Sequence, residues 1–173
     1  CTKYGIYTFT NCILGLPNTK IAEDIESLDI CLQSKVDWAE FPIFYPFPRT
    51  ELGDMCIKQG IYKPDYDEMH TSYQNRSLLT CFTEKEKNVQ MNLGVLGSVA
   101  VVLPWLRDLI VKHLIYWPPN RAFTLAYWLA KNYTLRRKIY VTKTGRWESL
   151  TIYFRSLKQE IFRHTRKEKL SKV

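Results

Sequence analysis

The sequence lacks closely spaced cysteines, which argues against several common kinds of site. Its five cysteines lie 11 to 25 residues apart, at Cys1, Cys12, Cys31, Cys56 and Cys81. This spacing offers no C-x2-C pair for zinc, and an odd, sparse set does not build a dense disulfide framework. The pattern favours a reducing, cytoplasmic setting. Cys12 and Cys31 fall at apolar positions of a predicted strand and a predicted helix, where we expect core side chains.

The sequence also lacks an apolar run long enough to span a bilayer. Its most apolar segment, LGVLGSVAVVLPWL (93–106), has 14 residues before Arg107, whereas a span needs about 20 residues. We therefore expect a buried core helix there. The sequence shows no signal-peptide pattern, internal repeat or low-complexity segment. It begins with Cys1 rather than Met, so we expect a processed or excised piece of a longer protein.

Positive charge is abundant but is concentrated at one end. The 173 residues carry a net charge of +8, and the segment 131–173 alone holds 13 basic and 3 acidic residues. A solvated helical face is the usual explanation, with contact to acidic lipid or nucleic acid as the alternatives. No recognised nucleic-acid motif accompanies the charge, so nucleic-acid binding is not favoured. The three histidines are far apart in sequence, and no metal ligand is assigned among them.

Hydrophobic periodicity in the first 60 residues predicts the order strand, helix, strand, helix. The predicted ranges are 7–14, 19–34, 37–45 and 50–59. A helical crossover of this length makes the two strands parallel neighbours. Two parallel strands do not form a stable sheet alone, because such sheets need both faces covered. We therefore expect further strands outside this chain.

Beyond residue 60 the pattern changes. Residues 61–80 are polar, contain Pro64 and lack periodicity, which predicts a linker or lid. The rest is helical, with predicted helices at 83–103, 105–117 and 121–133, and an amphipathic terminal helix whose apolar seam runs from Trp147 to Ile161. Thr83 with Glu86, and then Asn120, are predicted to cap the first and third of these helices.

Two strand-to-loop junctions resemble one known family. The segments ILGLPNTKIAED (13–24) and FYPFPRTEL (44–52) are similar to the "IGLPGET" and "F-x-PYPGTEL" segments of radical S-adenosylmethionine (SAM) enzymes that carry an N-terminal cobalamin-binding domain. In that group these segments end the fifth and sixth barrel strands. The later pattern PWL…LI…PPNRAF…Y (104–133) also resembles the helical C-terminal region of the group.

The resemblance implies an α/β fold made of the C-terminal units of a partial (β/α)6 TIM-like barrel, followed by an all-helical C-terminal region. Residues 1–60 would be the last two β/α units, 61–80 a linker or lid, and 81–173 the helical region with its basic tail helix. SAM would bind across the strand ends, where ligands of α/β proteins usually lie. The residues implied to contact it are Ile13, Leu14 and Gly15 at the adenine, and Phe44, Tyr45 and Pro46 along the adjacent wall.

Two glycines of the family pattern are replaced in these turns. Asn18 stands where the family has glycine, and asparagine tolerates a left-handed backbone. Arg49 replaces the glycine of the second segment, where a positive φ would be strained.

The larger departure is the missing C-x3-C-x2-C motif, whose thiolates hold the [4Fe–4S] cluster in this family. The resemblance places that motif and the cobalamin domain upstream of Cys1, so no cofactor-metal ligand is expected on this chain. The parent enzyme would cleave SAM reductively to a 5′-deoxyadenosyl radical, with or without the use of cobalamin. This chain alone would be inactive and would supply part of the SAM wall and a helical cap over a small-molecule or lipid-like substrate. No catalytic residue is assigned.

Two alternatives come from the tail. A non-enzymatic interaction module would dock the basic amphipathic helix on an acidic membrane surface or on a protein partner. A nucleic-acid contact by the same helix would instead weaken steeply with salt. Peripheral membrane contact by a cytoplasmic protein is thus one expectation. Three tryptophans, Trp105, Trp117 and Trp128, are expected either to shape an apolar substrate pocket or to pack in the core.

Overall fold

The computed structural model describes residues 1–64, 76–139, 151 and 155, and the chain divides into two compact units, Cys1–Ile139 and Tyr140–Val173. The predicted amphipathic tail helix and most of the basic segment lie outside the described residues. The first unit contains, in order, η1 (Thr2–Tyr4), β1 (Phe9–Asn11), α1 (Ile21–Gln33), β2 (Trp38–Glu40), α2 (Glu51–Lys58), α3 (Glu84–Val102), η2 (Pro104–Leu106), α4 (Arg107–Lys112), η3 (Leu114–Tyr116), α5 (Arg121–Thr134) and the π-helical turn η4 (Leu135–Ile139).

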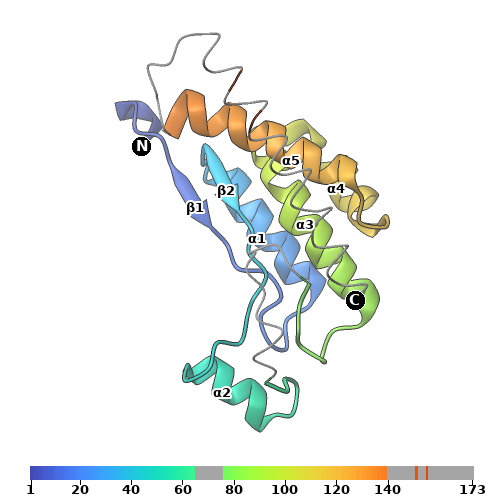
Figure 1. The fold of residues 1–173 in the computed structure, drawn as a ribbon. Coiled ribbons are helices and arrows are strands. Elements are labelled where there is room, and N and C mark those ends of the chain that lie inside the picture. Colours follow the sequence, from blue (N-terminus) through green and yellow to red (C-terminus); the bar gives the residue numbers. More distant parts are fainter. Residues whose placement is uncertain (65–75, 140–150, 152–154, 156–173) are drawn as a thin grey trace. The chain divides into compact units, whose positions relative to one another are not determined.

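The two strands are parallel neighbours, as predicted (Figure 1). Phe9 lies opposite Trp38 and Asn11 lies opposite Glu40. An isolated parallel bridge between Leu14 and Ile43 continues the same register beyond the strands. Within the described residues the fold is therefore mixed α/β, dominated by helices and containing a single two-stranded parallel sheet.

Both strands are shorter than the predicted ranges 7–14 and 37–45. At their carboxyl ends the reason is Pro42, which has no N–H to give to the ladder. The amide of Cys12 still donates to Glu40 O at 2.9 Å, and the amide of Leu14 donates to Pro42 O at 2.9 Å. The missing bond between them interrupts the ladder without separating the chains, so the two backbones remain side by side to residue 44.

Helix α1 begins later than predicted. Lys20, and neither Asn18 nor Thr19, is its N-cap residue, and its amide donates to Glu23 Oε2 at 3.2 Å. Asn18 has a φ of 64°, and the Thr19 hydroxyl donates to Leu16 O at 2.7 Å. Asn18 and Thr19 therefore belong to the preceding turn.

Helix α3 forms the centre of the described unit, in agreement with the predicted core helix. Its residues are buried nearly all round from Val89 to Val101, as in a helix surrounded by other elements. It contacts α1, β2, α4 and α5. The largest apolar cluster joins it to the strand–helix units through Leu14, Leu28, Cys31, Ala39, Phe41, Val89, Leu93, Leu96, Ala100, Val101, Ile110 and Ile115. None of the described helices combines the length and apolar character needed to cross a membrane.

The predicted helix over 105–117 is wrong as a single element. Pro104 starts the 3-10 turn η2, which passes into α4, and the backbone of His113 then leaves the helical region at φ −133° before η3. Asn92 of α3 donates to Ile115 O at 3.0 Å and to Trp117 O, which anchors the end of this segment. Asn92, 23 residues before Ile115, thus donates to carbonyl groups that would accept from backbone amides if the helix continued.

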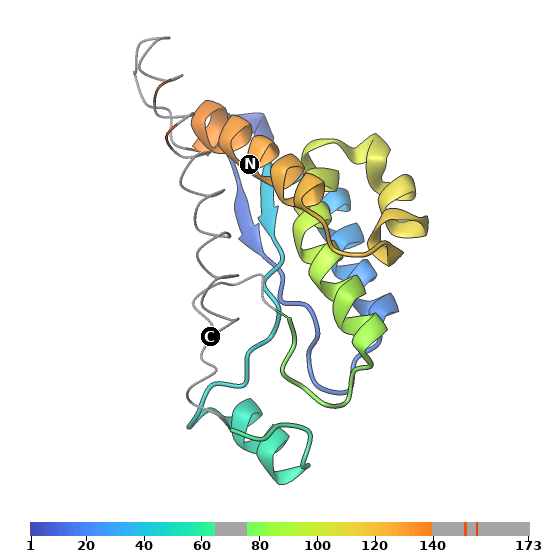
Figure 2. The ribbon, with the colours of Figure 1, turned by 45° about the vertical axis from the view of Figure 1, so that its right-hand side comes forward.

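The remaining elements begin where expected. Thr50, Thr83 and Asn120 accept hydrogen bonds from the backbones of α2, α3 and α5. Helix α2 lies beyond the carboxyl ends of the strands in both ribbon views (Figure 2). A small separate core, Cys56, Tyr62, Leu79 and Phe82, packs both ends of the predicted linker against it.

Candidate functional site

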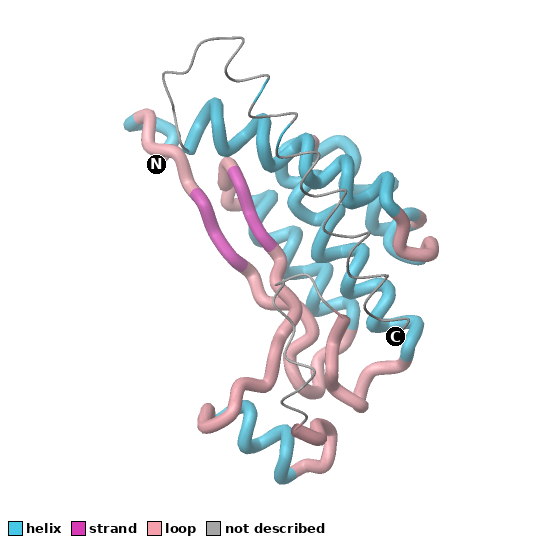
Figure 3. The backbone as a smooth tube through the Cα atoms, viewed as in Figure 1, coloured by secondary structure: helices cyan, strands magenta, loops and turns pink. Residues whose placement is uncertain are grey.

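The two segments that resemble a SAM-binding wall meet at the carboxyl ends of the strands. The amide of Phe44 donates to Leu14 O at 2.8 Å, directly beside the Leu14–Ile43 bridge. Figure 3 shows the loops that follow β1 and β2 gathered at this end of the molecule. Residues 13–15 and 44–46 are thus brought together, although 30 positions separate Leu14 from Phe44 in the sequence.

Ile13 and Leu14 have opposite environments. The Leu14 side chain is fully buried under α1, and both of its backbone polar groups are paired, the N–H with Pro42 O and the C=O with the Phe44 amide. Ile13 is 51% exposed on the opposite face of the strand. Its backbone N–H and C=O make no hydrogen bond within the described residues. Ile13 is therefore the residue of this pair that is available to a ligand.

Gly15 begins the first turn and is held by a buried carboxylate. Its φ is +66°, a conformation that favours glycine. Its amide donates to Asp24 Oδ1 at 2.8 Å. Asp24 lies in the first part of α1 and is only 3% exposed. Burial raises the pKa of the Asp24 carboxyl, and the hydrogen bonds from Gly15 and Gln90 oppose that rise.

Gln90 of α3 completes this network from the far side. Its amide nitrogen donates to Asp24 Oδ2 at 3.2 Å, and its side chain is fully buried. The Gln90 carbonyl oxygen has no donor, which is uncommon for a buried polar atom. A Cβ added to Gly15 would stand 3.0 Å from the Gln90 amide nitrogen, so Gln90 already covers that side of the glycine. A ring approaching Gly15 has to come from another direction.

The second turn carries a pair of packed aromatic rings. Phe44 and Tyr45 are partly buried and Pro46 is fully buried. The rings of Tyr45 and Phe47 pack at a centroid distance of 4.8 Å with an interplanar angle of 58°. An aromatic wall of this kind suits a flat apolar ligand.

Thr50 and Gly53 fix the passage from this turn into α2. The Thr50 hydroxyl accepts from the Gly53 amide at 3.1 Å and donates to Phe47 O at 2.7 Å. A Cβ at Gly53 would stand 2.1 Å from Phe47 O, so the close approach requires glycine. Arg49 adopts a φ of 62° although it is not glycine. The turn geometry thus survives the substitution at the expense of local strain.

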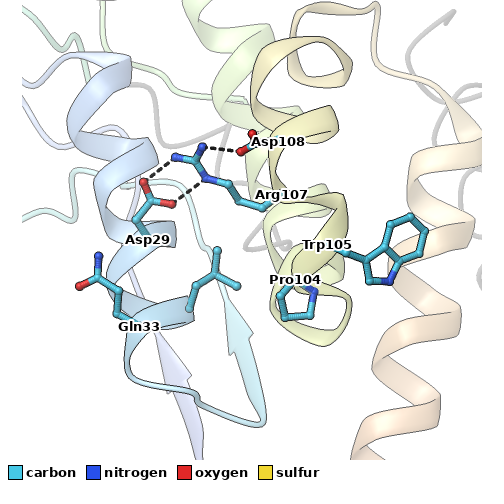
Figure 4. A pocket seen from close by; sticks show the side chains of 7 residues that line it. Asp29, Gln33, Pro104, Trp105, Arg107 and Asp108 are labelled. Atoms are coloured by element: carbon cyan, nitrogen blue, oxygen red, sulfur yellow. Dashed lines mark hydrogen bonds and ion pairs between the residues drawn. The ribbon is translucent and has the colours of Figure 1, made fainter.

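A pocket in the described region lies elsewhere. It is an open cleft of about 510 Å³ between the C-terminal half of α1 and the start of α4, lined by Asp29, Leu32, Gln33, Pro104, Trp105, Arg107 and Asp108. Figure 4 shows the Arg107 guanidinium directed at the Asp29 carboxylate, with distances of 2.9 and 2.6 Å. Arg107 also donates to Asp108 at 2.9 Å. Carboxylates therefore occupy the guanidinium, which leaves a poor site for an anionic ligand.

The three tryptophans have separate environments. Trp128 is buried, as the core alternative predicted. Trp105 lines the open cleft and is 75% exposed, and Trp117 is also exposed. The described residues thus do not bring the three together around one enclosed apolar pocket.

No group of three or more potential metal ligands occurs among the described residues. Comparison with protein-family models, curated proteins and solved structures finds no significant match. Sequence reasoning missed the Asp24–Gln90 pair, because Asp24 is unremarkable near a helix start and Gln90 lies 66 residues away. The signal that could have found it was a polar residue, Gln90, at the start of the apolar part of the predicted core helix.

Proposed function

We propose that this chain supplies the last two β/α units of an incomplete barrel in a radical SAM enzyme. The observation that carries the proposal is the parallel register that pairs Leu14, between Ile13 and Gly15, with Ile43 and Phe44 at one edge of the sheet. Ligands of α/β proteins bind at such an edge, and the sequence segments found there are those that resemble the family.

The outer edge of β1, unpaired within the part of the chain that the structure describes, is evidence that the sheet is incomplete. Its odd-numbered residues direct their backbone groups away from β2, and no second strand neighbours β1 in the described residues. On the face opposite α1, Tyr7, Phe9 and Ile13 are all exposed. A parallel sheet with an open edge and an uncovered apolar face needs further strands.

The residues present fit one part of SAM. The backbone groups of Ile13, which are unpaired among the described residues, can meet the hydrogen-bonding edge of adenine, and its side chain offers apolar contact. The described residues do not fit the iron–sulfur cluster, whose ligands we assign to the rest of the parent polypeptide, as we do those of cobalamin. In the parent, bound SAM would undergo reductive cleavage, and this chain would position the adenine and cap a small or lipid-like substrate.

The test uses the full-length parent protein, purified without oxygen, and compares two isoleucines of equal exposure. Ile13 is 51% exposed at the proposed site, and Ile30 is 54% exposed on α1. Ile13→Asp is expected to reduce release of 5′-deoxyadenosine by roughly tenfold or more, because it places a charge against the adenine. Ile30→Asp should leave the rate unchanged, with equal iron content in both variants.

Equal rates in the two variants would contradict the assigned wall. A parent reading frame without a C-x3-C-x2-C motif would contradict the enzyme class itself.

A further inference from the structure

Two cysteines from different elements lie sulfur to sulfur behind the first turn. The Sγ atoms of Cys12 and Cys31 are 3.3 Å apart, and both cysteines are free thiols. Cys12 directly follows β1, and Cys31 lies in α1. We propose that Cys12 and Cys31 form a reversible disulfide when the protein meets an oxidised low-molecular-weight disulfide such as oxidised glutathione.

The geometry needs little change. A disulfide bond is about 2.04 Å long, so each sulfur has to move by roughly 0.6 Å. The two cysteines belong to the same apolar cluster, Cys31 buried within it and Cys12 packed against it. The packing that holds the thiols together is therefore already present before oxidation, which gives each a high effective concentration at the other.

The two thiols have different access to solvent, which sets the order of the steps. Cys12 is partly exposed, whereas Cys31 is 3% exposed. Burial and the neighbouring Cys12 raise the pKa of the Cys31 thiol to about 12. Cys12 therefore meets the oxidant first, since only a thiolate that reaches the reagent can attack it.

The exchange balances in two steps. The Cys12 thiolate attacks the external disulfide, forms a mixed disulfide and releases one thiol. Cys31 then loses its proton, attacks Cys12 Sγ and releases the second thiol. The two protein thiols are oxidised by two electrons, and the external disulfide is reduced to two thiols. Reduction by excess thiol reverses both steps.

The bond would act on the first turn. It would join the strand end to α1 on either side of residues 13–20, a closure between residues 19 apart in sequence. Because such a closure restricts the unfolded chain, the midpoint of thermal unfolding is expected to rise by roughly 5–15 °C. This inference is independent of the proposed enzyme class, since it needs only the two thiols and an oxidant.

The sequence allows a clean mass-spectrometric test on the complete chain. Trypsin cleaves after Lys20 and Lys35, so each of the five cysteines falls in a different tryptic peptide. After treatment of the native protein with oxidised glutathione and alkylation of the remaining thiols, we expect peptides 4–20 and 21–35 to be joined. The joined species should be lighter by two hydrogens than the sum of the two and should separate on reduction.

Variants test the same assignment. Cys12→Ser should abolish both the joined peptides and the oxidant-dependent rise in the unfolding midpoint. Cys1→Ser and Cys81→Ser, which change exposed cysteines, should keep both. If Cys12→Ser fails to fold, the peptide map of the unchanged protein still decides. Glutathione held on Cys12 without joined peptides, or joining seen only in denaturant, would overturn the proposal.

Discussion

The turns after β1 and β2 hold similar backbone shapes by different means. Each contains a non-glycine residue with positive φ, Asn18 in the first and Arg49 in the second. The first turn depends on a buried carboxylate, Asp24, which in turn depends on Gln90 of α3. The second depends on contacts within seven residues, between Phe47, Thr50 and Gly53. One turn is anchored through tertiary structure and the other through local geometry.

The largest loss of stability is expected from a substitution that disrupts the second, locally held turn. Gly53→Ala would set a methyl group 2.1 Å from Phe47 O, and the atom in the way is backbone rather than a flexible side chain. We expect α2 to detach or the turn to shift, with a loss of about 3 kcal/mol or more in the free energy of unfolding. Denaturant unfolding measures the loss, and amide hydrogen exchange in α2 locates it.

Gly60→Ala is the matched control in the same region. Gly60 follows the C-cap of α2 with a φ of +69° and has open space around the position of a Cβ. Its substitution should cost only about 1 kcal/mol through backbone strain. If Gly53→Ala were no more destabilising than Gly60→Ala, the close approach of Phe47 would not be what holds this turn.

The next largest loss is expected from removing the Asp24 carboxylate, which anchors the first turn. Asp24→Ala leaves the buried Gly15 amide and the Gln90 side chain without their acceptor, which should cost roughly 1–3 kcal/mol. Asp24→Asn should be close to neutral, because an asparagine oxygen can accept from Gly15. If the Gln90 side-chain amide rotates by 180°, its unpaired oxygen can accept a hydrogen bond from the new asparagine amide. Equal losses in the two variants would contradict this account.

The stabilities of the original protein and of Asp24→Asn should depend differently on pH. The folded-state pKa of Asp24 lies above its ordinary value, so between the two values the folded protein binds more protons than the unfolded chain. The contribution of this group to stability is full at lower pH and is lost as pH rises through the raised pKa. Asp24→Asn removes that loss. The variant should therefore gain stability relative to the original protein as pH rises, measured by chemical denaturation at several pH values.

The comparison also explains what the sequence could predict. The Thr83 and Asn120 caps depend on neighbours in the chain, and parallel pairing follows from the length of the connecting helix; all three were predicted. The Asp24–Gln90 contact joins residues 66 apart, and Asn92 ends the segment after α4 from 23 residues away. Local sequence patterns do not predict such long-range contacts. The sequence did predict that the two motif segments lie at one edge of the sheet, because parallel strands align their carboxyl ends.

The smallest change in stability is expected from glycine substitutions at the positive-φ residues, which compare the backbone strain in the two turns. Arg49 and Asn18 have nearly equal φ values, 62° and 64°, but arginine is less tolerant of this region than asparagine. Arg49→Gly should therefore raise the free energy of unfolding by about 0.5–1 kcal/mol, despite the added flexibility of glycine in the unfolded chain. Asn18→Gly should gain less, since asparagine is already adapted. The difference between the two midpoints of urea unfolding measures the strain held in the second turn. A larger gain at Asn18 would mean that the strain lies in the turn fixed by Asp24, because Arg49 would then be the better accommodated residue.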